Sequence, residues 1–374
     1  MASISQKSLF SWQDVEKVGD LKRLKLVLEN LPDEQLMKTL EEYRGNGLLI
    51  RHKLELHKFF NDLVKLCMQE LPGFSRQLAL DGKAIESYAR RNGKTADDGR
   101  GDQDADWGRH VYSGIDSNGR MWETIKKWFG YKLHLIVDSE YELPVAFTLT
   151  RASVNEMPVA HKLLESLDRS HPKLMEHAEY LSADKGLDDG KLVERLWDEW
   201  EIKPIIDIRN QWKDPDSTKV LPGHENILYN YQGTVTCMCP KLNKIRTMAY
   251  GGFEADRSTL KYRCPAAHYG FTCEGQQQCE VGAGIRIPLD IDRRIFTPVA
   301  RSSYKWKRLY KKRTAVERVN SRLDTAFGFE HHTMRGIGKV SVKLNLSFIV
   351  MLTIGLGWSR ENHPELIRSL YRTA

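Results

Sequence analysis

The sequence predicts an α/β protein: a mixed sheet flanked by helices, with an N-terminal helical domain and a cysteine-containing insertion subdomain. Three observations support this. Helical periodicity dominates the first 75 residues, β-rich and helical runs alternate from 76 to 210, and the pattern breaks from 211 to 294. A chain of 374 residues, 41% of them hydrophobic, is long enough for two or three domains with real cores.

Residues 1–75 are predicted to form the helical domain. DVEKVGDLKRLKLVLENL and LELHKFFNDLVKLCMQEL both place apolar residues at helical spacing. The middle of the region is basic, which suits either a DNA-binding domain or a solvated bundle. No helix-turn-helix pattern is clear enough to decide between the two, so both interpretations stay open.

No segment predicts secretion or a membrane span. The N-terminal MASISQKSLFSW lacks the charged start and apolar core of a signal peptide. The longest apolar run, LNLSFIVMLTIGLGW (344–358), is interrupted by polar residues and is too short to cross a bilayer, so we expect a buried helix. Six cysteines without a secretion signal suggest a reducing, cytoplasmic setting.

The first part of the core is predicted over residues 76–210. LALDGKAI reads as a strand ending at Asp81, and YKLHLIVDS and LPVAFTLT form a hairpin around SEYE. Two strands with intervening helices follow, EYLSADKG and IKPIIDIRN. The acidic segment DDGRGDQDADWG (97–108) reads as a solvated loop rather than a calcium loop. Trp107, Trp122 and Trp128 suit either base stacking or core packing.

Residues 211–294 are too long for an ordinary loop and are predicted to be an inserted subdomain. The core then resumes over residues 295–358, and a tail covers 359–374. The insert contains five cysteines and a histidine that could supply a structural Zn²⁺ site, although the spacing matches no standard pair and free thiols are the alternative. These residues are Cys237, Cys239, Cys264, His268, Cys273 and Cys279.

Three acidic residues are candidates for a catalytic metal site. Asp81 and Asp184 each end a predicted strand, and Glu317 lies on a late helix. Ligands bind at strand ends in open α/β sheets, and clustered carboxylates are stable at neutral pH mainly around a divalent cation such as Mg²⁺ or Mn²⁺. Taken singly, each Asp is also compatible with an ordinary turn.

The segment from Arg301 to Arg322 carries nine Lys or Arg residues and one Glu, which suits a phosphate backbone. On a continuous helix, Tyr310, Arg313 and Glu317 share a face, beside an apolar stripe. Arg313 is then placed to hold a phosphate, and Tyr310 to stack or hydrogen-bond beside it. The residues expected to make general backbone contacts with DNA are Lys307, Arg308, Lys311, Lys312, Arg318 and Arg322.

Residues 76–358 resemble a bacterial insertion-sequence transposase of the DDE superfamily. LALDGKAI and LSADKGLDD match the segments of the two aspartates, and YKKRTAVERVNSRL matches the Tyr-x2-Arg-x3-Glu signature helix. Many relatives carry a lysine where this chain has Asp324, which puts a phosphate-clamping role there in doubt.

The resemblance implies a ribonuclease-H-like fold and a Mg²⁺-dependent reaction on double-stranded DNA. Water activated by two metal ions would cut at the terminal inverted repeats, and the 3′-hydroxyl would attack target DNA. The acting species would be a homo-oligomer, a dimer on DNA, in the bacterial cytoplasm. The rival interpretations are a structure-selective nuclease without strand transfer and a transposase-derived DNA-binding protein that does not cut.

Overall fold

The computed structural model describes residues 21–31, 49–89, 101–116, 119–214, 216–279 and 281–369. The chain divides into two compact units. Unit 1 consists of Met1–Arg76, Leu80–Leu174 and Ala315–Ala374, and unit 2 of Gln77–Ala79 and Met175–Thr314. The predicted helices before residue 21 and between 32 and 48 lie outside the described residues.

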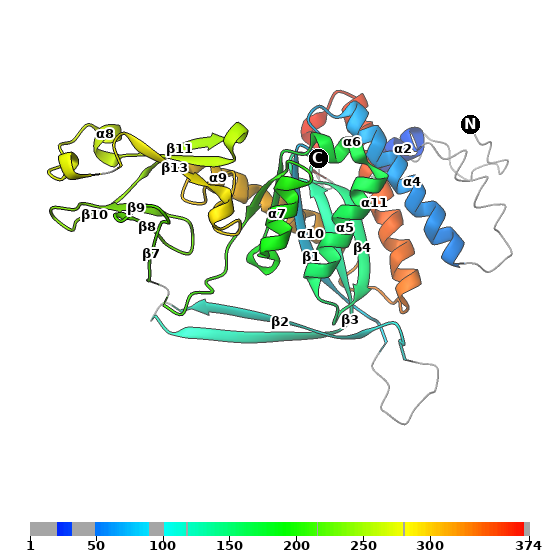
Figure 1. Cartoon of the computed structure of the whole chain (residues 1–374). Helices are drawn as coiled ribbons and strands as arrows, with labels where there is room; N and C mark the ends of the chain where they lie inside the picture. Colours follow the sequence, from blue (N-terminus) through cyan, green and yellow to red (C-terminus); the bar gives the residue numbers. More distant parts are fainter. Residues whose placement is uncertain are drawn as a thin grey trace, which may run out of the picture. The chain divides into compact units, whose positions relative to one another are not determined.

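Unit 1 contains an antiparallel arrangement centred on one long strand, β3 (Figure 1). Its strands are β1 (Gln77–Glu86), β2 (Asp106–Ile115), β3 (Met121–Asp138) and β4 (Leu143–Arg151). The first half of β3 pairs with β2, the second half pairs with β4, and β1 lies on the other side. The β3–β4 hairpin around residues 139–142 confirms the sequence prediction.

Two of these strands differ from the sequence interpretation. β1 does not end at Asp81 but runs on to Glu86, because Gly82 keeps the chain extended instead of turning it. The predicted solvated loop ends at residue 105, and β2 begins at Asp106. The part of that loop from 97 to 100 lies outside the described residues. Gly119, with a φ of 76°, lies in the connection to β3.

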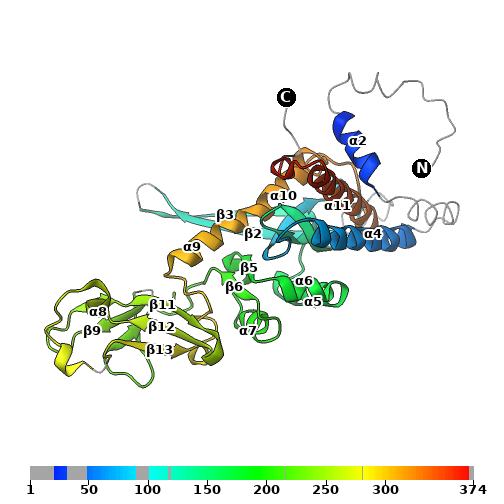
Figure 2. The same ribbon diagram turned by 90° about the horizontal axis from the view of Figure 1, so that it is seen from above.

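The helices described in unit 1 include one long apolar helix, α11 (Figure 2). They are α2 (Leu21–Asn30), α4 (Leu49–Glu70), α5 (Glu156–Ser170), α10 (Thr314–Thr325) and α11 (Ile337–Arg360), with α6 (Pro172–His177) at the boundary with unit 2. α11 packs on α4, α2 and β4. The described N-terminal helices therefore belong to the same unit as part of the core, and the domain boundary predicted at residue 75 stays a prediction.

The centre of unit 1 is an aromatic cluster. Phe348 of α11 packs edge-on against Phe147 of β4 at a centroid distance of 4.8 Å, and Phe60 of α4 lies 5.3 Å from Phe147. α11 is longer than the apolar run in the sequence, and by length and composition it could cross a membrane. However, 78% of its most apolar window is buried inside the protein, so it is a core helix as predicted.

Unit 2 begins with a parallel pair of strands and continues into the insert. The first elements are β5 (Tyr180–Ala183), a 3₁₀ turn η1 (Lys185–Leu187), α7 (Gly190–Asp198) and β6 (Lys203–Ile206). β5 lies beside the start of β1 and pairs parallel with β6. The alternation of strand and helix predicted from the sequence is therefore present, with α7 packed on β6.

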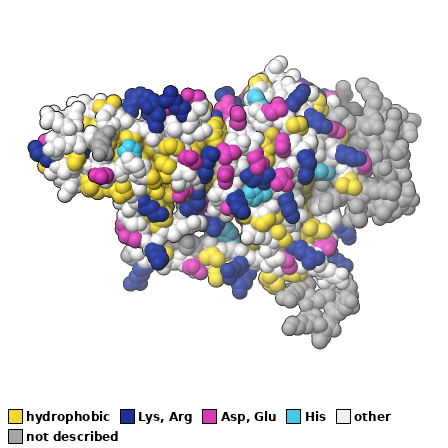
Figure 3. Space-filling model, in the orientation of Figure 1, with side chains coloured by type: hydrophobic (Ala, Val, Ile, Leu, Met, Phe, Trp, Pro, Cys, Tyr) yellow, Lys and Arg dark blue, Asp and Glu magenta, His cyan; other side chains and the backbone are white. Residues whose placement is uncertain are grey.

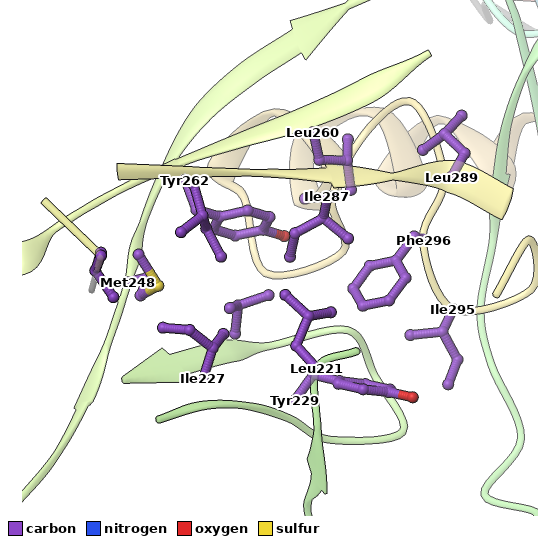
Figure 4. Packing of buried hydrophobic residues seen from close by; sticks show 14 of the residues in the cluster. Leu221, Ile227, Tyr229, Met248, Leu260, Tyr262, Ile287, Leu289, Ile295 and Phe296 are labelled. Atoms are coloured by element: carbon purple, nitrogen blue, oxygen red, sulfur yellow. The ribbon is translucent and has the colours of Figure 1, made fainter. Parts of the chain in front are cut away.

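The insert contains two small antiparallel sheets, one ordered β10-β9-β8-β7 and the other β11-β12-β13. Their strands are β7 (Lys219–Val220), β8 (Ile227–Tyr229), β9 (Val235–Met238), β10 (Ile245–Thr247), β11 (Ala249–Glu254), β12 (Thr259–Arg263) and β13 (Gly284–Pro288), with the short helix α8 (Pro265–Tyr269) after β12. Tyr262, Ile287, Leu221 and Phe296 converge in one apolar core (Figure 4). The insert is thus built around a hydrophobic core to which flanking residues such as Ile208 and Phe296 also contribute.

Candidate active site

Asp81 lies in the middle of β1, where the strand changes from buried to half-buried residues. Its Oδ1 accepts the N–H of Gly82 at 2.8 Å, which fixes the orientation of the carboxylate. Since side chains alternate along a strand, Lys83 lies on the same face of β1 as Asp81. A Cβ added at Gly82 would lie 3.1 Å from the Glu156 carboxylate, so the opposite face is closely packed.

Lys83 forms an ion pair with Asp324 of α10. Its Nζ lies 2.6 Å from Asp324 Oδ2, and the two side chains are 13% and 31% exposed. The Asp324 carboxylate is therefore engaged by a lysine from β1. This pair ties α10 to the strand that carries Asp81.

Glu317 is an exposed residue in the first turn of α10. The apolar stripe predicted for this helix is confirmed, because Ala315, Val316, Val319 and Leu323 are all buried. α10 is thus held by its apolar face, with Glu317 on the solvent side.

Two arginines predicted to contact DNA bind a buried carboxylate of unit 1. Glu142, in the β3–β4 turn, is 4% exposed, and its Oε1 lies 2.6 Å from Arg318 Nε. Arg322 pairs with Oε2 of Glu142 and donates to its backbone carbonyl at 2.8 Å. Arg322 therefore fixes α10 to the β3–β4 turn, and a DNA contact from this largely buried side chain stays a prediction.

In unit 2, Asp184 follows β5 directly, as predicted, and caps the turn η1 by accepting the N–H of Gly186 at 2.7 Å. The parallel register pairs Ala183 with Ile206, so Asp207 follows β6 at the level of Asp184. Sequence reasoning missed Asp207. The signal that could have found it is the repeated pattern of a short apolar strand ending in Asp, in LSAD and PIID.

The predicted basic helix is not continuous. α9 (Tyr304–Tyr310) ends in the 3₁₀ turn η5 (Lys311–Arg313) before α10 begins at Thr314. A 3₁₀ turn has 3.0 residues per turn instead of 3.6, so side chains at i and i+3 eclipse, and Tyr310 and Arg313 lie on the same side of the chain. The face they are predicted to share with Glu317 stays a prediction. Ser303 starts α9 by accepting the N–H of Trp306.

Tyr310 lies between two other side chains of unit 2. Its ring stacks on Trp306 at a centroid distance of 4.7 Å, and the Arg313 guanidinium lies over the ring at 5.7 Å. Trp306 and Leu309 are buried with residues of β5 and β6, which anchors α9. One ring face is thus occupied by Trp306, which leaves less of the ring for the predicted stacking on DNA.

The two strand-end carboxylates act on Tyr310 electrostatically. Burial raises the pKa of the Tyr310 hydroxyl, and the negative charges of Asp207 and Asp184 raise it further, while Arg313 lowers it. The phenol therefore stays protonated and can donate a hydrogen bond at neutral pH. Unit 2 thus brings together Asp184, Asp207, Tyr310 and Arg313.

Arg301 begins the basic segment in the sequence but is buried, at 8% exposed. It donates to the carbonyls of Ile206 and Ile295, at 3.1 and 2.8 Å, and so holds the end of β6. Burial lowers its pKa to about 10, partly offset by the charges of Asp188 and Asp207. Its role is structural, whereas Lys307, Arg308 and Lys311 are exposed as expected.

The donor chemistry of the three predicted acids suits a hard divalent cation, since carboxylate oxygens are the ligands Mg²⁺ prefers. Asp81 and Glu317 lie in unit 1 and Asp184 in unit 2. Among the residues that the structure describes, no group of three His, Cys, Asp or Glu side chains is arranged to hold a metal ion. The metal-ligand roles of these acids therefore stay predictions.

The cysteines of the insert are all free thiols, like Cys67 in the core. Backbone N–H groups of Leu242, Lys241 and Gly275 lower the pKa of Cys239. Burial raises the pKa of Cys237 to about 11, and its thiol neighbours, foremost Cys264, raise it as well. The thiols are thus near one another but are not grouped as a metal site in the described part of the chain, and zinc stays a prediction.

A protein-family model described as a transposase DDE domain matches residues 72–353, well over half of the chain. The chain belongs to the DDE transposase family. The mixed α/β fold agrees with the ribonuclease-H-like fold of such transposases. No match was found among curated proteins or among solved structures. Family membership makes this transposase a DNA-acting protein of a class that generally uses divalent metal ions.

Proposed function

We propose that this transposase cuts the ends of its own transposon in a metal-dependent reaction and joins the released 3′-hydroxyl to target DNA. The observation that carries the proposal is the family match over residues 72–353 with both signature aspartates and the signature glutamate in the expected segments. Asp81, Asp184 and Glu317 are assigned as the metal-binding acids. The expected active species is a homodimer bound to the terminal inverted repeats, in the cytoplasm.

Bound Mg²⁺ or Mn²⁺ would supply activation of the attacking oxygen and charge stabilisation at the phosphate. The chain's own contribution is to hold and orient its acids. Asp81 and Asp184 are each fixed by a backbone N–H from a nearby glycine. Glu317 lies on a helix fixed by Asp324 and Arg322 to unit 1. Rigid acids favour catalysis because they need no rearrangement when substrate binds.

The phosphate backbone would be held by cationic side chains of α9 and η5. Arg313, positioned by Tyr310, is assigned to a phosphate at or beside the cleavage point. Lys307, Arg308, Lys311 and Lys312 extend the positive surface along α9 and η5. Guanidinium and ammonium groups bind phosphate oxygens through charge-assisted hydrogen bonds, so this surface suits a polyanion.

The insert carries a second basic surface. Figure 3 shows Lys and Arg side chains gathered over β11 and β13. Lys261 lies directly opposite Arg286 in the register of β12 and β13, and both line a cavity of about 530 Å³ together with Arg263 and His268. This surface supports the assignment of the insert as a part that helps to hold the transposon end.

The test uses supercoiled DNA that carries the terminal repeats of the element, incubated with the full-length protein and Mg²⁺. Joined products are the expected result. Asp81→Asn, Asp184→Asn and Glu317→Gln should each abolish cutting and leave DNA affinity nearly unchanged. Glu330→Gln, an exposed acid outside these elements, is the matched control and should cut normally.

The rival functions give different products in the same assay. Cutting without joining would replace the proposal by a nuclease, and a stable complex with neither product would replace it by a DNA-binding protein. Substantial cutting by the Glu317→Gln protein would remove Glu317 from the site. A monomer on the terminal repeat, measured by light scattering of the complex, would contradict the dimer.

A further inference from the structure

A two-stranded ribbon extends from unit 1, and its described residues 121–127 are exposed on both of its faces. It consists of β2 and residues 121–130 of β3, paired from Asp106↔Gly130 to Ile115↔Met121 (Figures 1 and 2). The seven residues from Met121 to Lys127 are all exposed, although side chains alternate between the two faces of a strand. Neither face of the ribbon is therefore part of the core.

The ribbon is held by aromatic side chains that lie over glycines of the opposite strand. A Cβ added at Gly108 would come within 2.4 Å of the Trp128 ring, and one at Gly114 within 2.7 Å of the Trp122 ring. Trp128 is buried at the base of the ribbon and donates its Nε1–H to the carbonyl of Tyr131 at 3.0 Å. These contacts stabilise a hairpin that would be marginal alone.

Two adjacent rungs of the ribbon place basic side chains opposite basic side chains. Arg109 lies opposite Lys127, and His110 lies opposite Lys126. All four residues are exposed, and neither rung contains a carboxylate. Like charges directly opposite one another destabilise a β-pair, so the Arg109–Lys127 rung weakens the ribbon when no partner is bound. A polyanionic partner would turn this repulsion into attraction.

The distribution over the two faces points to duplex DNA. Arg109 and Lys127 share one face, and Lys126 lies on the other with His110. The major groove of B-DNA is about 12 Å wide and admits a two-stranded ribbon, which then meets a phosphate backbone on each side. Cations on both faces match these two backbones. Figure 3 shows Lys and Arg side chains along the lower edge of the molecule, where the ribbon runs in Figure 1.

Apolar side chains on the ribbon are also exposed, among them Trp107 at 50%, Trp122 at 46% and Ile125 at 48%. Exposed aromatic and apolar groups beside cations can contact bases and sugars inside a groove. They can also contact a second copy of the chain. Arg109, Lys126 and Lys127 disfavour the second copy, because an identical ribbon would bring the same positive charges together.

We propose that the β2–β3 ribbon is a DNA-binding arm that grips the phosphate backbones of duplex DNA through Arg109, Lys126 and Lys127. This rests on the proposed function only in taking DNA as the substrate. The arm adds affinity and places no group in the chemistry, so its loss weakens binding without changing the acids of the active site.

The test compares full-length wild-type protein with the triple variant Arg109→Gln/Lys126→Gln/Lys127→Gln. Binding of a labelled random-sequence duplex is measured by anisotropy between about 50 and 200 mM salt. Each phosphate contact contributes about 0.9 to the salt slope, so three lost contacts lower the slope by about 2.7 and the affinity at about 0.1 M salt by up to about 500-fold. At least a tenfold loss is expected.

The matched control removes three positive charges elsewhere in unit 1, with Lys162→Gln/Arg169→Gln/Lys173→Gln. It should keep the wild-type slope. The ribbon variant should melt no lower than wild type, because it loses repulsion between like charges. Its cleavage of terminal-repeat DNA should fall at limiting protein and recover at saturating protein.

A ribbon variant with wild-type slope and affinity would overturn the proposal, and an altered oligomeric state with unchanged DNA affinity would assign the ribbon to a second copy. If the wild-type protein cuts DNA and the ribbon variant binds DNA with normal affinity, only the DNA-binding arm is refuted. If the wild-type protein binds through the ribbon but does not cut DNA, only the proposed function is refuted. Wild-type protein that binds no duplex overturns both.

Discussion

The anchor of α10 gives a prediction that is independent of DNA chemistry. Glu142 is 4% exposed and holds two arginines of α10, of which Arg322 is 11% exposed and Arg318 is 50% exposed. Glu142→Gln keeps the shape of the side chain and removes its charge. The backbone of Glu142 is left-handed, with φ of 57°, and the substitution leaves that geometry as it is.

The expected loss in the free energy of unfolding of Glu142→Gln comes almost entirely from the broken pair with Arg322. Removing one partner of a buried ion pair costs about 3 to 5 kcal/mol, because a charge stays buried without compensation. The glutamine oxygen can still accept one hydrogen bond, so we expect about 2 to 3 kcal/mol. The half-exposed Arg318 adds less than about 1 kcal/mol. For a unit of this size the loss lowers the melting temperature by roughly 4 to 12 °C.

The assay is thermal and urea unfolding of wild type, Glu142→Gln, Arg322→Gln and the double variant. The double-mutant cycle should give a coupling energy above about 1 kcal/mol. Glu199→Gln breaks an exposed i,i+4 pair with Arg195 and should cost less than about 1 kcal/mol. Faster hydrogen exchange of α10 should accompany the loss at Glu142. A coupling energy near zero would refute the role of Glu142 as the anchor of the helix that carries Glu317.

Four further outcomes are expected. Asp324→Asn leaves the 13%-exposed Lys83 without its carboxylate partner and should lower the free energy of unfolding, measured with urea, by about 1 to 3 kcal/mol. The double variant Lys83→Asp/Asp324→Lys, which reverses the pair, should regain part of that free energy. Burial, with the charge of Lys132, lowers the pKa of His134 to about 4, so the folded state binds fewer protons than the unfolded state. The contribution of His134 to the free energy of unfolding is complete above about pH 6.5 and falls by about 3 kcal/mol as the pH is lowered toward 4. The free energy of unfolding of His134→Gln should lack this pH dependence. Phe348→Ala should lower the free energy of unfolding by about 3 to 5 kcal/mol, and a loss under 1 kcal/mol would contradict its central packing. Metal analysis of purified protein should find about one zinc per chain, reduced in Cys239→Ser, and zinc-free folded protein would end that prediction.

The local patterns of the chain were enough to predict much of the fold. The alternation of strands and helices, the β3–β4 hairpin, the buried helix α11 and the apolar stripe of α10 all follow from periodicities of two or 3.6 residues. The segments around Asp81, Asp184 and Glu317 were enough to indicate the family. Each of these signals lies within one stretch of about ten to twenty residues, where neighbouring residues alone determine the pattern.

Contacts between distant residues had no such signal. Arg318 and Arg322 were predicted to contact DNA because the local sequence reveals the positive charge of the helix. It does not reveal that the carboxylate of Glu142, some 180 residues away, pairs with both arginines. The level of Asp207 beside Asp184 depends on the register of two parallel strands. The exposed part of the ribbon became evident only once β2 was paired with β3 and residues 121–127 proved to be exposed on both faces. The sequence by itself determined the helices, the strands and the family. The tertiary structure decided which charged side chains form ion pairs inside the protein and which face solvent. The reason is that burial and pairing depend on residues that come together only when the chain folds.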